Sequence, residues 1–243
     1  MSPSPPPSRA ADGIYLESVT LLRGGRPVFD GLTLALCEPR IGLIGDNGAG
    51  KSSLFRLICG LEPPQQGRVL VHGCDTRTAR RELPGRVGLM FQNPDEQIIF
   101  PTVAEELAFS LSAQGLPRKD ARQRAQDFLA QRGLADWGAR AIGELSQGQR
   151  QQVCLLALQI SQPATLLLDE PFASLDLPSQ ARLAAQLRRT PQQIIFSTHA
   201  LAHVQDFDRV LWLEQGRLRA DGPGREVCAA YAEDVRQRAV AHA

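Results

Sequence analysis

Features that mark several protein classes are absent from this chain of 243 residues. No apolar run approaches the roughly 18–20 residues that a membrane-spanning helix needs, so a place at a membrane would require a partner protein. The five cysteines are scattered and include no Cys-x-x-Cys pair, which favours a reduced, cytosolic protein over a metal site or a disulfide scaffold. The opening residues, MSPSPPPS, lack the apolar segment of a signal peptide, and we expect a disordered Pro/Ser tail over 1–12.

An excess of charge of one sign is absent as well. The 27 Lys and Arg residues balance 26 Asp and Glu residues and leave a net charge of +1, so nucleic-acid binding has no electrostatic support. Lysine is scarce, because all positive residues except Lys51 and Lys119 are arginines. The 43% of hydrophobic and 22% of charged residues are ordinary for a globular protein and exclude wholesale disorder. A lysine retained in such a composition is a candidate functional residue.

Short apolar segments alternate with helical ones along most of the chain. This alternation indicates an α/β sheet, largely parallel in its central part. Between Val103 and Ser161 the strand-like runs disappear and Leu and Ala recur at helical spacing, which predicts a helical lobe inserted into the core. We also expect a helix over 178–189, and a short helix followed by a loose tail over 227–243. The expected strands lie at 14–21, 32–36, 40–44, 68–72, 86–91, 165–168, 193–197 and 209–213.

The segment GDNGAGKS at 45–52 matches the phosphate-binding pattern G-x-x-x-x-G-K-[ST]. It follows an expected buried strand and precedes an expected helix, so its backbone N–H groups would point at an anion. Lys51 would reach the β- and γ-phosphates, and the Ser52 hydroxyl would ligate Mg²⁺. A guanidinium is too wide for such a cradle, which explains a lysine here. The alternative, a glycine loop that only turns the chain, is disfavoured by the strand–loop–helix context.

A second motif, LLLDEP at 166–171, is a hydrophobic strand that ends in two adjacent carboxylates. Neighbouring side chains of a strand point to opposite faces, and only the strand's end can relax this alternation. Asp169 could then hold the Mg²⁺ shell, while Glu170 faces the γ-phosphate and orients or deprotonates water. The alternative is a solvated strand end. Together, the two motifs predict a site that hydrolyses a nucleoside triphosphate with Mg²⁺.

From Ile14 to Gly222 the chain resembles the nucleotide-binding subunits of ATP-binding-cassette (ABC) proteins. The segment LSQGQ at 145–149 is similar to the family's LSGGQ signature, with Gln147 in place of the first glycine. The resemblance implies that this loop binds the γ-phosphate of ATP held by a second subunit, so that two chains sandwich the nucleotide. Taken alone, the segment could simply begin a helix at Ser146. The residues that would bind ATP in trans are Ser146, Gln147, Gly148, Gln149 and Asp176.

The same resemblance implies roles for residues outside these motifs. Gln92 matches a glutamine that binds metal and water, and 174–176 matches a loop that communicates across the dimer. His199 matches a histidine that contacts the γ-phosphate and the attacking water; a lone histidine at a strand end is usually structural, but its place after the carboxylate pair favours function. The implied catalytic residues are Glu170, His199 and Gln92, and the implied Mg²⁺ ligands are Ser52, Gln92 and Asp169. The implied ATP-binding residues are Gly45, Asn47, Gly48, Ala49, Gly50, Lys51, Ser52, Ser53 and Arg23.

The adenine contact departs from the family pattern. The family usually has an aromatic residue near the end of the first strand, but Leu22 and Arg23 stand at that place. The guanidinium of Arg23 could stack on the base instead, or Tyr15 could reach it.

A narrower resemblance lies in QNPDEQIIF at 92–100, which is similar to the ATPase components of energy-coupling factor (ECF) importers of vitamins or of Co²⁺ and Ni²⁺. It implies a groove that receives an arginine-bearing helix of a transmembrane protein. Asp95 and Glu96 would be its ionic partners. The alternative is a solvated acidic turn above core residues. The apolar floor of the groove would be Ile98, Ile99 and Phe100.

We therefore expect an α/β P-loop NTPase (RecA-like) core with an antiparallel β segment at its N-terminus and an inserted α-helical subdomain. The expected ranges are 13–92 and 162–222 for the core, 93–161 for the helical subdomain and 223–243 for a C-terminal helix or tail. The expected function is ATP hydrolysis coupled to import, by a homodimer or a heterodimer with a related ATPase. A transmembrane coupling protein and a substrate-binding membrane subunit would hold it at the cytoplasmic face of the inner membrane, and the isolated subunit would be soluble.

The cargo would be biotin, another vitamin, or Co²⁺ or Ni²⁺; the strand at 40–44 and the compact C-terminus favour biotin-type systems. One alternative is a soluble ABC ATPase that acts as a scaffold, for example in iron–sulfur cluster assembly. Another is a P-loop kinase, which would leave 145–149 and 174–176 without a role.

Overall fold

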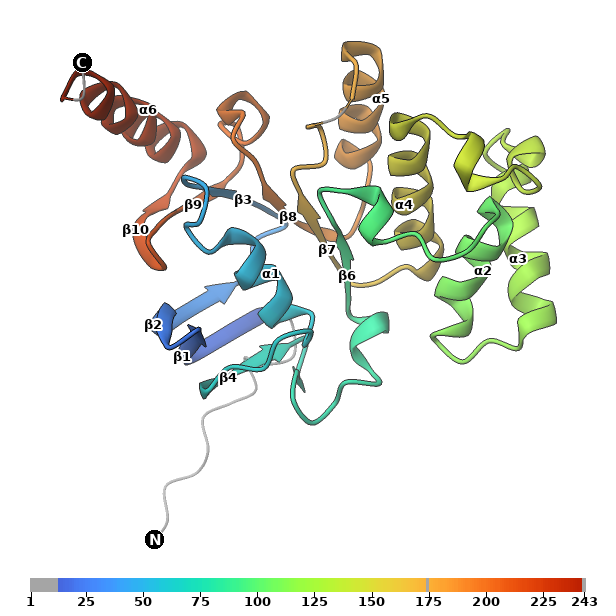
Figure 1. Ribbon diagram of the computed structural model, residues 1–243, viewed down its shortest axis with the longest axis horizontal. Helices are drawn as coiled ribbons and strands as arrows, with labels where there is room; N and C mark the ends of the chain where they lie inside the picture. Colours follow the sequence, from blue (N-terminus) through green and yellow to red (C-terminus); the bar gives the residue numbers. More distant parts are fainter. Residues whose placement is uncertain (1–12, 174, 242–243) are drawn as a thin grey trace, which may run out of the picture.

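A six-stranded sheet runs through the centre of the molecule (Figure 1). The structure is a computed structural model, which describes residues 13–173 and 175–241. The strand order of the sheet is β10-β9-β3-β8-β7-β6; the strands from β9 to β6 are parallel and β10 is antiparallel at one edge. The apolar runs occupy the inner positions, where both faces of the sheet are covered. The strands are β3 (Arg40–Ile44), β6 (Val87–Met90), β7 (Thr165–Asp169), β8 (Gln193–Ser197), β9 (Arg209–Glu214) and β10 (Arg217–Gly222).

A second, antiparallel sheet of order β2-β1-β4-β5 is formed by the first part of the described chain. The broken alternation at Glu17 and Ser18 has a structural cause. Ser18 adopts φ +48° and the β1–β2 register shifts there, so that Leu16 and Val19 both face the core. The strands are β1 (Ile14–Arg23), β2 (Arg26–Leu36), β4 (Gln66–Val71) and β5 (Cys74–Asp75).

Helix α1 (Lys51–Ile58) shares one hydrophobic core with both sheets. The chain reaches α1 from β3 through a loop that begins with Gly45. This residue has φ +142°, and a Cβ built on it would lie 2.1 Å from the carbonyl oxygen of Leu213 in β9. Only glycine fits this position, so the loop lies directly against the neighbouring strand.

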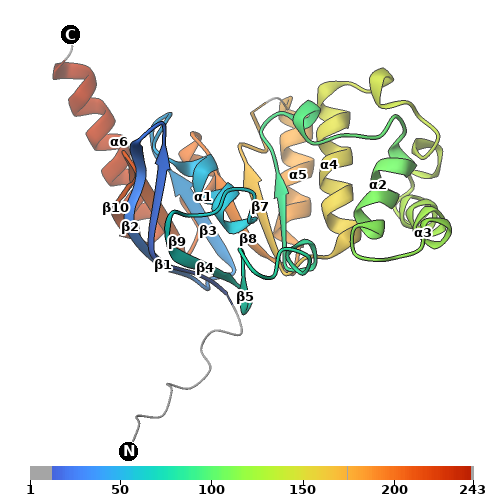
Figure 2. The same cartoon turned by 60° about the horizontal axis from the view of Figure 1, so that its bottom comes forward.

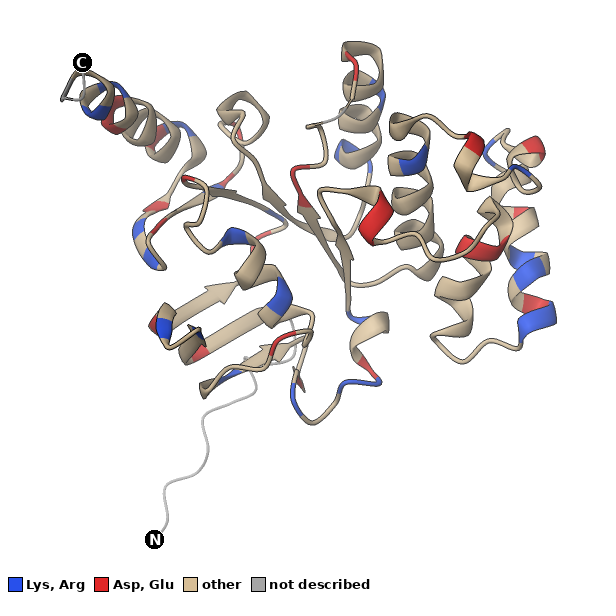
Figure 3. Ribbon diagram, viewed as in Figure 1, with Lys and Arg blue, Asp and Glu red and all other residues tan. Residues whose placement is uncertain are grey.

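A helical part lies at the end of the molecule opposite the C-terminal helix (Figure 2). Helices α2 (Val103–Ser112), α3 (Arg118–Ala130) and α4 (Gln147–Ser161) surround a separate hydrophobic core with residues such as Leu107 and Leu129. Arginines and carboxylates are interspersed on α3, as they are on the C-terminal helix (Figure 3). Single 3-10 turns connect the elements at η1 (Leu83–Gly85), η2 (Pro94–Glu96), η3 (Ala135–Trp137), η4 (Ile142–Glu144) and η5 (Leu201–His203).

The C-terminal region differs from the sequence expectation. Helix α5 (Leu177–Arg188) agrees with the predicted helix, but α6 (Gly224–Ala241) is 18 residues long instead of a short helix followed by a tail. The expectation was wrong because α6 has only a narrow apolar stripe, including Val227 and Cys228, and polar contacts hold its outer half. Strand β10 was missed because its residues alternate only between exposed and half-buried.

Two expectations fall on residues outside the described ranges: the Pro/Ser tail over 1–12, and Ser174 of the 174–176 loop. Across the two described ranges, no helix combines the length and the apolar character needed to cross a membrane.

Candidate functional site

The predicted phosphate loop and carboxylate pair line one cleft of about 280 Å³, here called the Lys51 cleft. Parallel strands β3 and β7 end on the same side of the sheet, which brings the loop after β3 beside the carboxylates after β7. Val28 in β2 is the one lining residue that sequence reasoning missed, and no motif marks it. The full lining is Arg23, Val28, Asn47, Gly48, Ala49, Gly50, Lys51, Ser52, Ser53, Gln92, Asp169, Glu170 and His199.

Lys51 is only 8% exposed and is held by the loop itself. Its Nζ donates hydrogen bonds to the carbonyl oxygens of Gly45 at 2.6 Å and Asp46 at 3.1 Å. Burial lowers the pKa of the ammonium group, and the nearby carboxylates of Glu170 and Asp169 act in the opposite direction. The cleft therefore contains a fixed positive group that can bind an anion.

Asp169 lies at the end of β7 and accepts two hydroxyl hydrogen bonds. Ser52 Oγ donates to its Oδ2 at 2.7 Å, and Ser197 Oγ in β8 donates to its Oδ1 at 2.9 Å. Gln92 lies beside this pair, because a smaller cavity of about 150 Å³ is lined by Ser52, Gln92 and Asp169 together. A hydroxyl, a carboxylate and an amide oxygen fit the preference of Mg²⁺ for hard oxygen ligands.

Glu170 reaches the same cleft as Asp169 because the backbone leaves the strand conformation between them. Glu170 has φ +48°, and its N–H donates to the carbonyl oxygen of Ser197 at 3.1 Å. The side chain lies 3.3 Å from His199 Nε2, measured to Oε1. The carboxylates of Asp169 and Glu170 therefore face the same cleft, which the alternation of a regular strand would not allow.

The protonation of this pair follows from its surroundings. Burial raises the pKa of Glu170 to about 7; the Asp169 charge adds to the rise and Lys51 opposes it. Burial also lowers the pKa of His199, as does the positive charge of Lys51, so that the imidazole is neutral at pH 7. A carboxylate with a pKa near neutrality can accept a proton from water.

Arg23 lines the Lys51 cleft, but its guanidinium group is already paired. It binds Glu62 through two hydrogen bonds of 2.6 and 3.2 Å, which hold the plane of the group in place. Tyr15 lies near the opposite end of β1, roughly 25 Å away along the strand, and does not line the cleft. Of the two residues considered for the base contact, only Arg23 is therefore in position.

Four of the five residues expected to act in trans line a different cleft of about 550 Å³, here called the Ser146 cleft. Ser146 caps α4: its Oγ accepts from Gln149 N at 3.3 Å, while Gln149 Oε1 accepts from Ser146 N at 3.0 Å. Gly148, Gln149 and Asp176 line this cleft with Ser146, whereas Gln147 does not. No residue lines both clefts among those that the structure describes.

A buried glutamine that sequence reasoning did not use connects the two clefts. Gln151 in α4 is 2% exposed, and its Nε2 donates to the carbonyl oxygen of Pro171 at 2.6 Å. Pro171 directly follows Glu170, so the helix that begins at Ser146 is tied to the segment that carries the carboxylates. A sequence signal for it existed: the residues three, four and seven positions after Gln151 are apolar, which places Gln151 on the apolar face of the expected helix.

The acidic segment 92–100 already forms an ion pair within this chain, which the sequence did not predict. Asp95 Oδ1 forms an ion pair with Arg150 Nη1 at 2.6 Å, although the Asp95 side chain stays 61% exposed. For Glu96 no ion pair is found with any residue in the described ranges, and it lines the small cavity beside Gln92. Glu96 is thus the carboxylate that remains accessible to another protein.

The apolar residues of this segment divide between the core and the surface. Ile98 packs partly against the core, whereas Ile99 is 70% exposed. The ring of Phe100 lies 5.0 Å from that of Phe109, which is 42% exposed. The buried carboxylate of Glu106 fixes the segment by accepting from the N–H groups of residues 99 and 100, each at 2.9 Å. The exposed apolar side chains in this region are therefore those of Ile99 and Phe109, whereas Ile98 is partly buried.

Comparison with known proteins gives one consistent result. The family model described as "ABC transporter" matches residues 33–173. A "Biotin transport ATP-binding protein BioM" of Rhodobacter capsulatus is 51% identical over 90% of this chain and 93% of its own length. An "Energy-coupling factor transporter ATP-binding protein EcfA1" of Symbiobacterium thermophilum is 38% identical over 78% of this chain and 68% of its own length. Among solved structures, cbiO1 of Clostridium perfringens, part of the ABC transporter complex cbiONQ, superimposes with a TM-score of 0.75; it is 26% identical and the match covers 92% of this chain and 93% of that chain.

Proposed function

This chain belongs to the ABC transporter family as an ATP-hydrolysing subunit of the energy-coupling factor type, and we propose that it powers the import of biotin. The predicted P-loop NTPase fold and the predicted ATPase activity are both confirmed. The observation that carries the cargo assignment is the likeness, over nearly the whole chain, to the biotin transport protein of Rhodobacter capsulatus. The scaffold alternative is not favoured, because both curated relatives described above are named as transporter subunits.

In the proposed mechanism, the Lys51 cleft binds the triphosphate of ATP. The backbone N–H groups after Gly45 and the N-terminus of α1 surround the phosphates, and the Lys51 ammonium exchanges the loop carbonyls for phosphate oxygens. Ser52, Asp169 and Gln92 would hold Mg²⁺, which when bound neutralises charge on the phosphates. The contact between Ser52 and Asp169 supports this assignment, because it already brings two of the three ligands together.

Glu170 and His199 handle the attacking water in this proposal. Glu170 orients the water and accepts its proton, a role that suits a pKa of about 7. The neutral His199 lies 3.3 Å from that carboxylate and contacts the γ-phosphate. Once Glu170 has accepted the proton it is uncharged, which is the form that burial favours.

The second half of each site comes from another subunit, either an identical chain or a related ATPase. The separation of the Ser146 cleft from the Lys51 cleft supports this arrangement, because a triphosphate in the one cleft leaves the N-terminus of α4 unused. ATP would close the dimer by bridging the two clefts, and hydrolysis would reopen it, which is a population shift driven by contacts made only in the closed state.

The same proposal holds the subunit at the cytoplasmic face of the membrane through a transmembrane coupling protein, next to a substrate-binding membrane subunit. Glu96 and the exposed Ile99 and Phe109 offer an accessible acid beside an apolar surface. Asp95 would exchange Arg150 for an arginine of the partner protein. Because Gln92 begins this segment and lines the same small cavity as Ser52 and Asp169, it would report nucleotide occupancy to the membrane.

Uptake of labelled biotin tests the proposal in cells that lack this protein. We expect wild type to restore uptake and Glu170→Gln to fail, while Asp120→Asn, the same chemical change on an exposed residue of α3, restores it. Restoration of Co²⁺ or Ni²⁺ uptake instead of biotin uptake would refute the cargo. Purification of the native protein without any polytopic membrane protein would refute the transporter assignment.

A further inference from the structure

A carboxylate stands inside the phosphate loop, at a position that the mechanism above does not use. Asp46 follows Gly45, and its carbonyl oxygen accepts from Lys51 Nζ at 3.1 Å. Its side chain is turned the other way and does not line the Lys51 cleft. A negative charge in this loop would repel the triphosphate that the cleft is proposed to bind.

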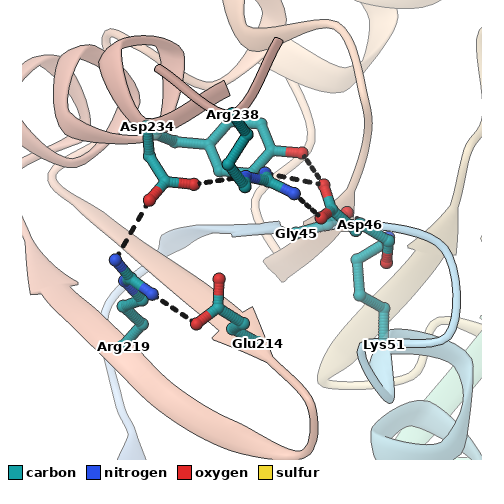
Figure 4. A network of polar contacts seen from close by, with 8 residues as sticks. Gly45, Asp46, Lys51, Glu214, Arg219, Asp234 and Arg238 are labelled. Atoms are coloured by element: carbon teal, nitrogen blue, oxygen red, sulfur yellow. Dashed lines mark hydrogen bonds and ion pairs between the residues drawn. The ribbon is translucent and has the colours of Figure 1, made fainter. Parts of the chain in front are cut away.

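Two residues of α6 hold this carboxylate from the far side (Figure 4). Tyr231 Oη donates to Asp46 Oδ1 at 2.7 Å, and Arg238 Nη1 donates to Asp46 Oδ2 at 2.6 Å. The phosphate loop and the last helix of the described chain are 185 to 192 residues apart in sequence, so only the fold brings them together. These bonds stabilise the ionised carboxylate, and the pKa of Asp46 is lowered accordingly.

Arg238 is itself fixed by a chain of ion pairs. Its Nε donates to Asp234 Oδ2 at 2.7 Å, and the other oxygen of Asp234 accepts from Arg219 Nη2 at 3.0 Å. Arg219 also pairs with Glu214, as Figure 4 shows, and lies 4.8 Å above the ring of Trp212. An isolated exposed ion pair contributes little, but a network that limits the side chains to one geometry contributes more.

Tyr231, the other residue that binds Asp46, is positioned by an aromatic contact. The ring of Tyr231 packs edge-on against Trp212, with centroids 5.2 Å apart. Burial, with a further contribution from the Asp46 carboxylate, raises the pKa of Tyr231 to about 12, so the phenol remains a donor at neutral pH. Helix α6 thus presents one neutral and one positive donor to the same carboxylate.

We propose that α6 positions the phosphate loop for nucleotide binding, with Tyr231 and Arg238 holding the Asp46 carboxylate away from the bound triphosphate and neutralising its charge. The proposal rests on the nucleotide site proposed above and assigns α6 a role in that site. Tyr231 and Arg238 are positioning residues, since they act through Asp46 and line neither cleft.

Steady-state ATP hydrolysis by the full chain, with its membrane partners where they stimulate it, tests this role. Arg238→Gln should raise the KM for ATP about three- to fivefold, the effect of one ion pair, and leave kcat within about twofold of wild type. Arg238→Glu should raise KM at least about tenfold, because it places a second carboxylate beside Asp46. Arg238→Lys keeps the charge but lacks the fork of donors that bridges Asp46 and Asp234, so it should raise KM less than Arg238→Gln does.

Matched variants separate this role from general damage to the helix. Arg236→Gln removes an exposed pair with Glu233 on the same helix and should change neither constant. Tyr231→Phe keeps the ring against Trp212 and should raise KM about twofold by removing one hydrogen bond. Circular dichroism melting of every variant identifies any change in KM that accompanies loss of folding.

The decisive measurement is a double-mutant cycle with Asp46→Asn. If Arg238 acts by neutralising Asp46, Arg238→Gln should have no further effect on KM once Asp46 is uncharged. An equal rise in KM in both backgrounds, or a KM of Arg238→Gln and Arg238→Glu equal to that of wild type, would overturn the inference while leaving the nucleotide site intact. Wild type that binds no ATP with Mg²⁺ in calorimetry would instead refute the proposed function, and this inference with it.

Discussion

The Lys51 cleft and the Ser146 cleft lie in the same chain but differ in chemical content. The first brings together an ammonium, two carboxylates and an imidazole. The second is lined by the capped start of α4 and by apolar residues such as Trp137, Leu155 and Leu175. Its only charged lining residues within the described ranges are Asp176 and Arg182. One cleft carries the groups for hydrolysis, and the other has a helix terminus suited to recognising an anion. The comparison supports the proposal that one chain holds two unlike halves of a site.

The largest expected effect is that of removing the proton acceptor from the Lys51 cleft. Glu170→Gln should reduce ATP turnover by about 10²–10⁴-fold, because an amide cannot accept the proton of water, and should preserve ATP binding and favour a stable dimer. Lys51→Ala should lose ATP binding in addition to ATP turnover. Turnover is followed by phosphate release, binding by calorimetry and dimer formation by size-exclusion chromatography. Hydrolysis at the wild-type rate by Glu170→Gln would remove Glu170 from the mechanism.

Mixing two inactive variants tests whether the clefts combine between chains. Lys51→Ala disables one cleft, and Ser146→Arg blocks the other with a bulky side chain. If each site uses one cleft from each chain, an equimolar mixture contains hybrid dimers with one intact site and should recover about a quarter of wild-type hydrolysis. If both clefts of one chain served a single nucleotide, the mixture would stay as inactive as its components.

The pH dependence of the reaction should report the state of Glu170 in the Lys51 cleft. Because the carboxylate must be ionised and its pKa is about 7, kcat/KM should fall as pH drops below 7, by up to about tenfold per unit, and level off above it. The Kd of Glu170→Gln for ATP should not show this pH dependence, because an amide does not titrate in this range. A kcat/KM constant between pH 6 and 8 would show that Glu170 is not the titrating base.

The same raised pKa has a consequence for stability. Folding favours the protonated carboxyl, so the folded state loses stability relative to the unfolded state as pH rises from the unfolded pKa towards about 7. Glu170→Gln should therefore raise the melting temperature more at pH 8 than at pH 5. An equal shift at both pH values would contradict the assigned pKa.

A smaller effect is expected at the link between the clefts. Gln151→Leu leaves the carbonyl of Pro171 buried without its donor, which should lower the free energy of unfolding by about 1–3 kcal/mol. Chemical denaturation measures this change. The exposed neighbour provides the control, since Gln152→Leu should leave stability within about 0.5 kcal/mol of wild type. Equal effects of the two substitutions would show that the Gln151 contact contributes nothing specific.

The smallest expected effect concerns the acidic segment outside both clefts. Asp95→Asn breaks an exposed ion pair with Arg150 and should change the free energy of unfolding by less than about 1 kcal/mol. If the segment binds a membrane protein, the same substitution should nevertheless weaken co-purification of that protein. Wild-type co-purification with both Asp95→Asn and Glu96→Gln would argue against this surface as the docking groove.

The sequence was most informative where function requires particular residue types at fixed spacing. GDNGAGKS and LLLDEP could be assigned because a phosphate cradle needs glycine and lysine, and a metal and water site needs adjacent acids; the structure brings both to one cleft. The sequence was less informative for contacts without a motif. Val28 carries no sequence signal, and Gln151 belongs to no motif, although its helical spacing marks a buried face. The length of α6 was underestimated because polar contacts hold its outer half.

The sequence by itself determined the chemistry proposed for this protein: which groups would bind phosphate, hold metal and accept a proton, since those proposed roles depend on side-chain type and local backbone. Only the tertiary structure decided how these groups are held and divided. It turned Glu170 into the cleft through a left-handed backbone, and it paired Asp95 with Arg150. It also brought Arg238 to Asp46 across 192 residues. Such pairings depend on how distant elements pack, and local sequence patterns carry no information about that packing.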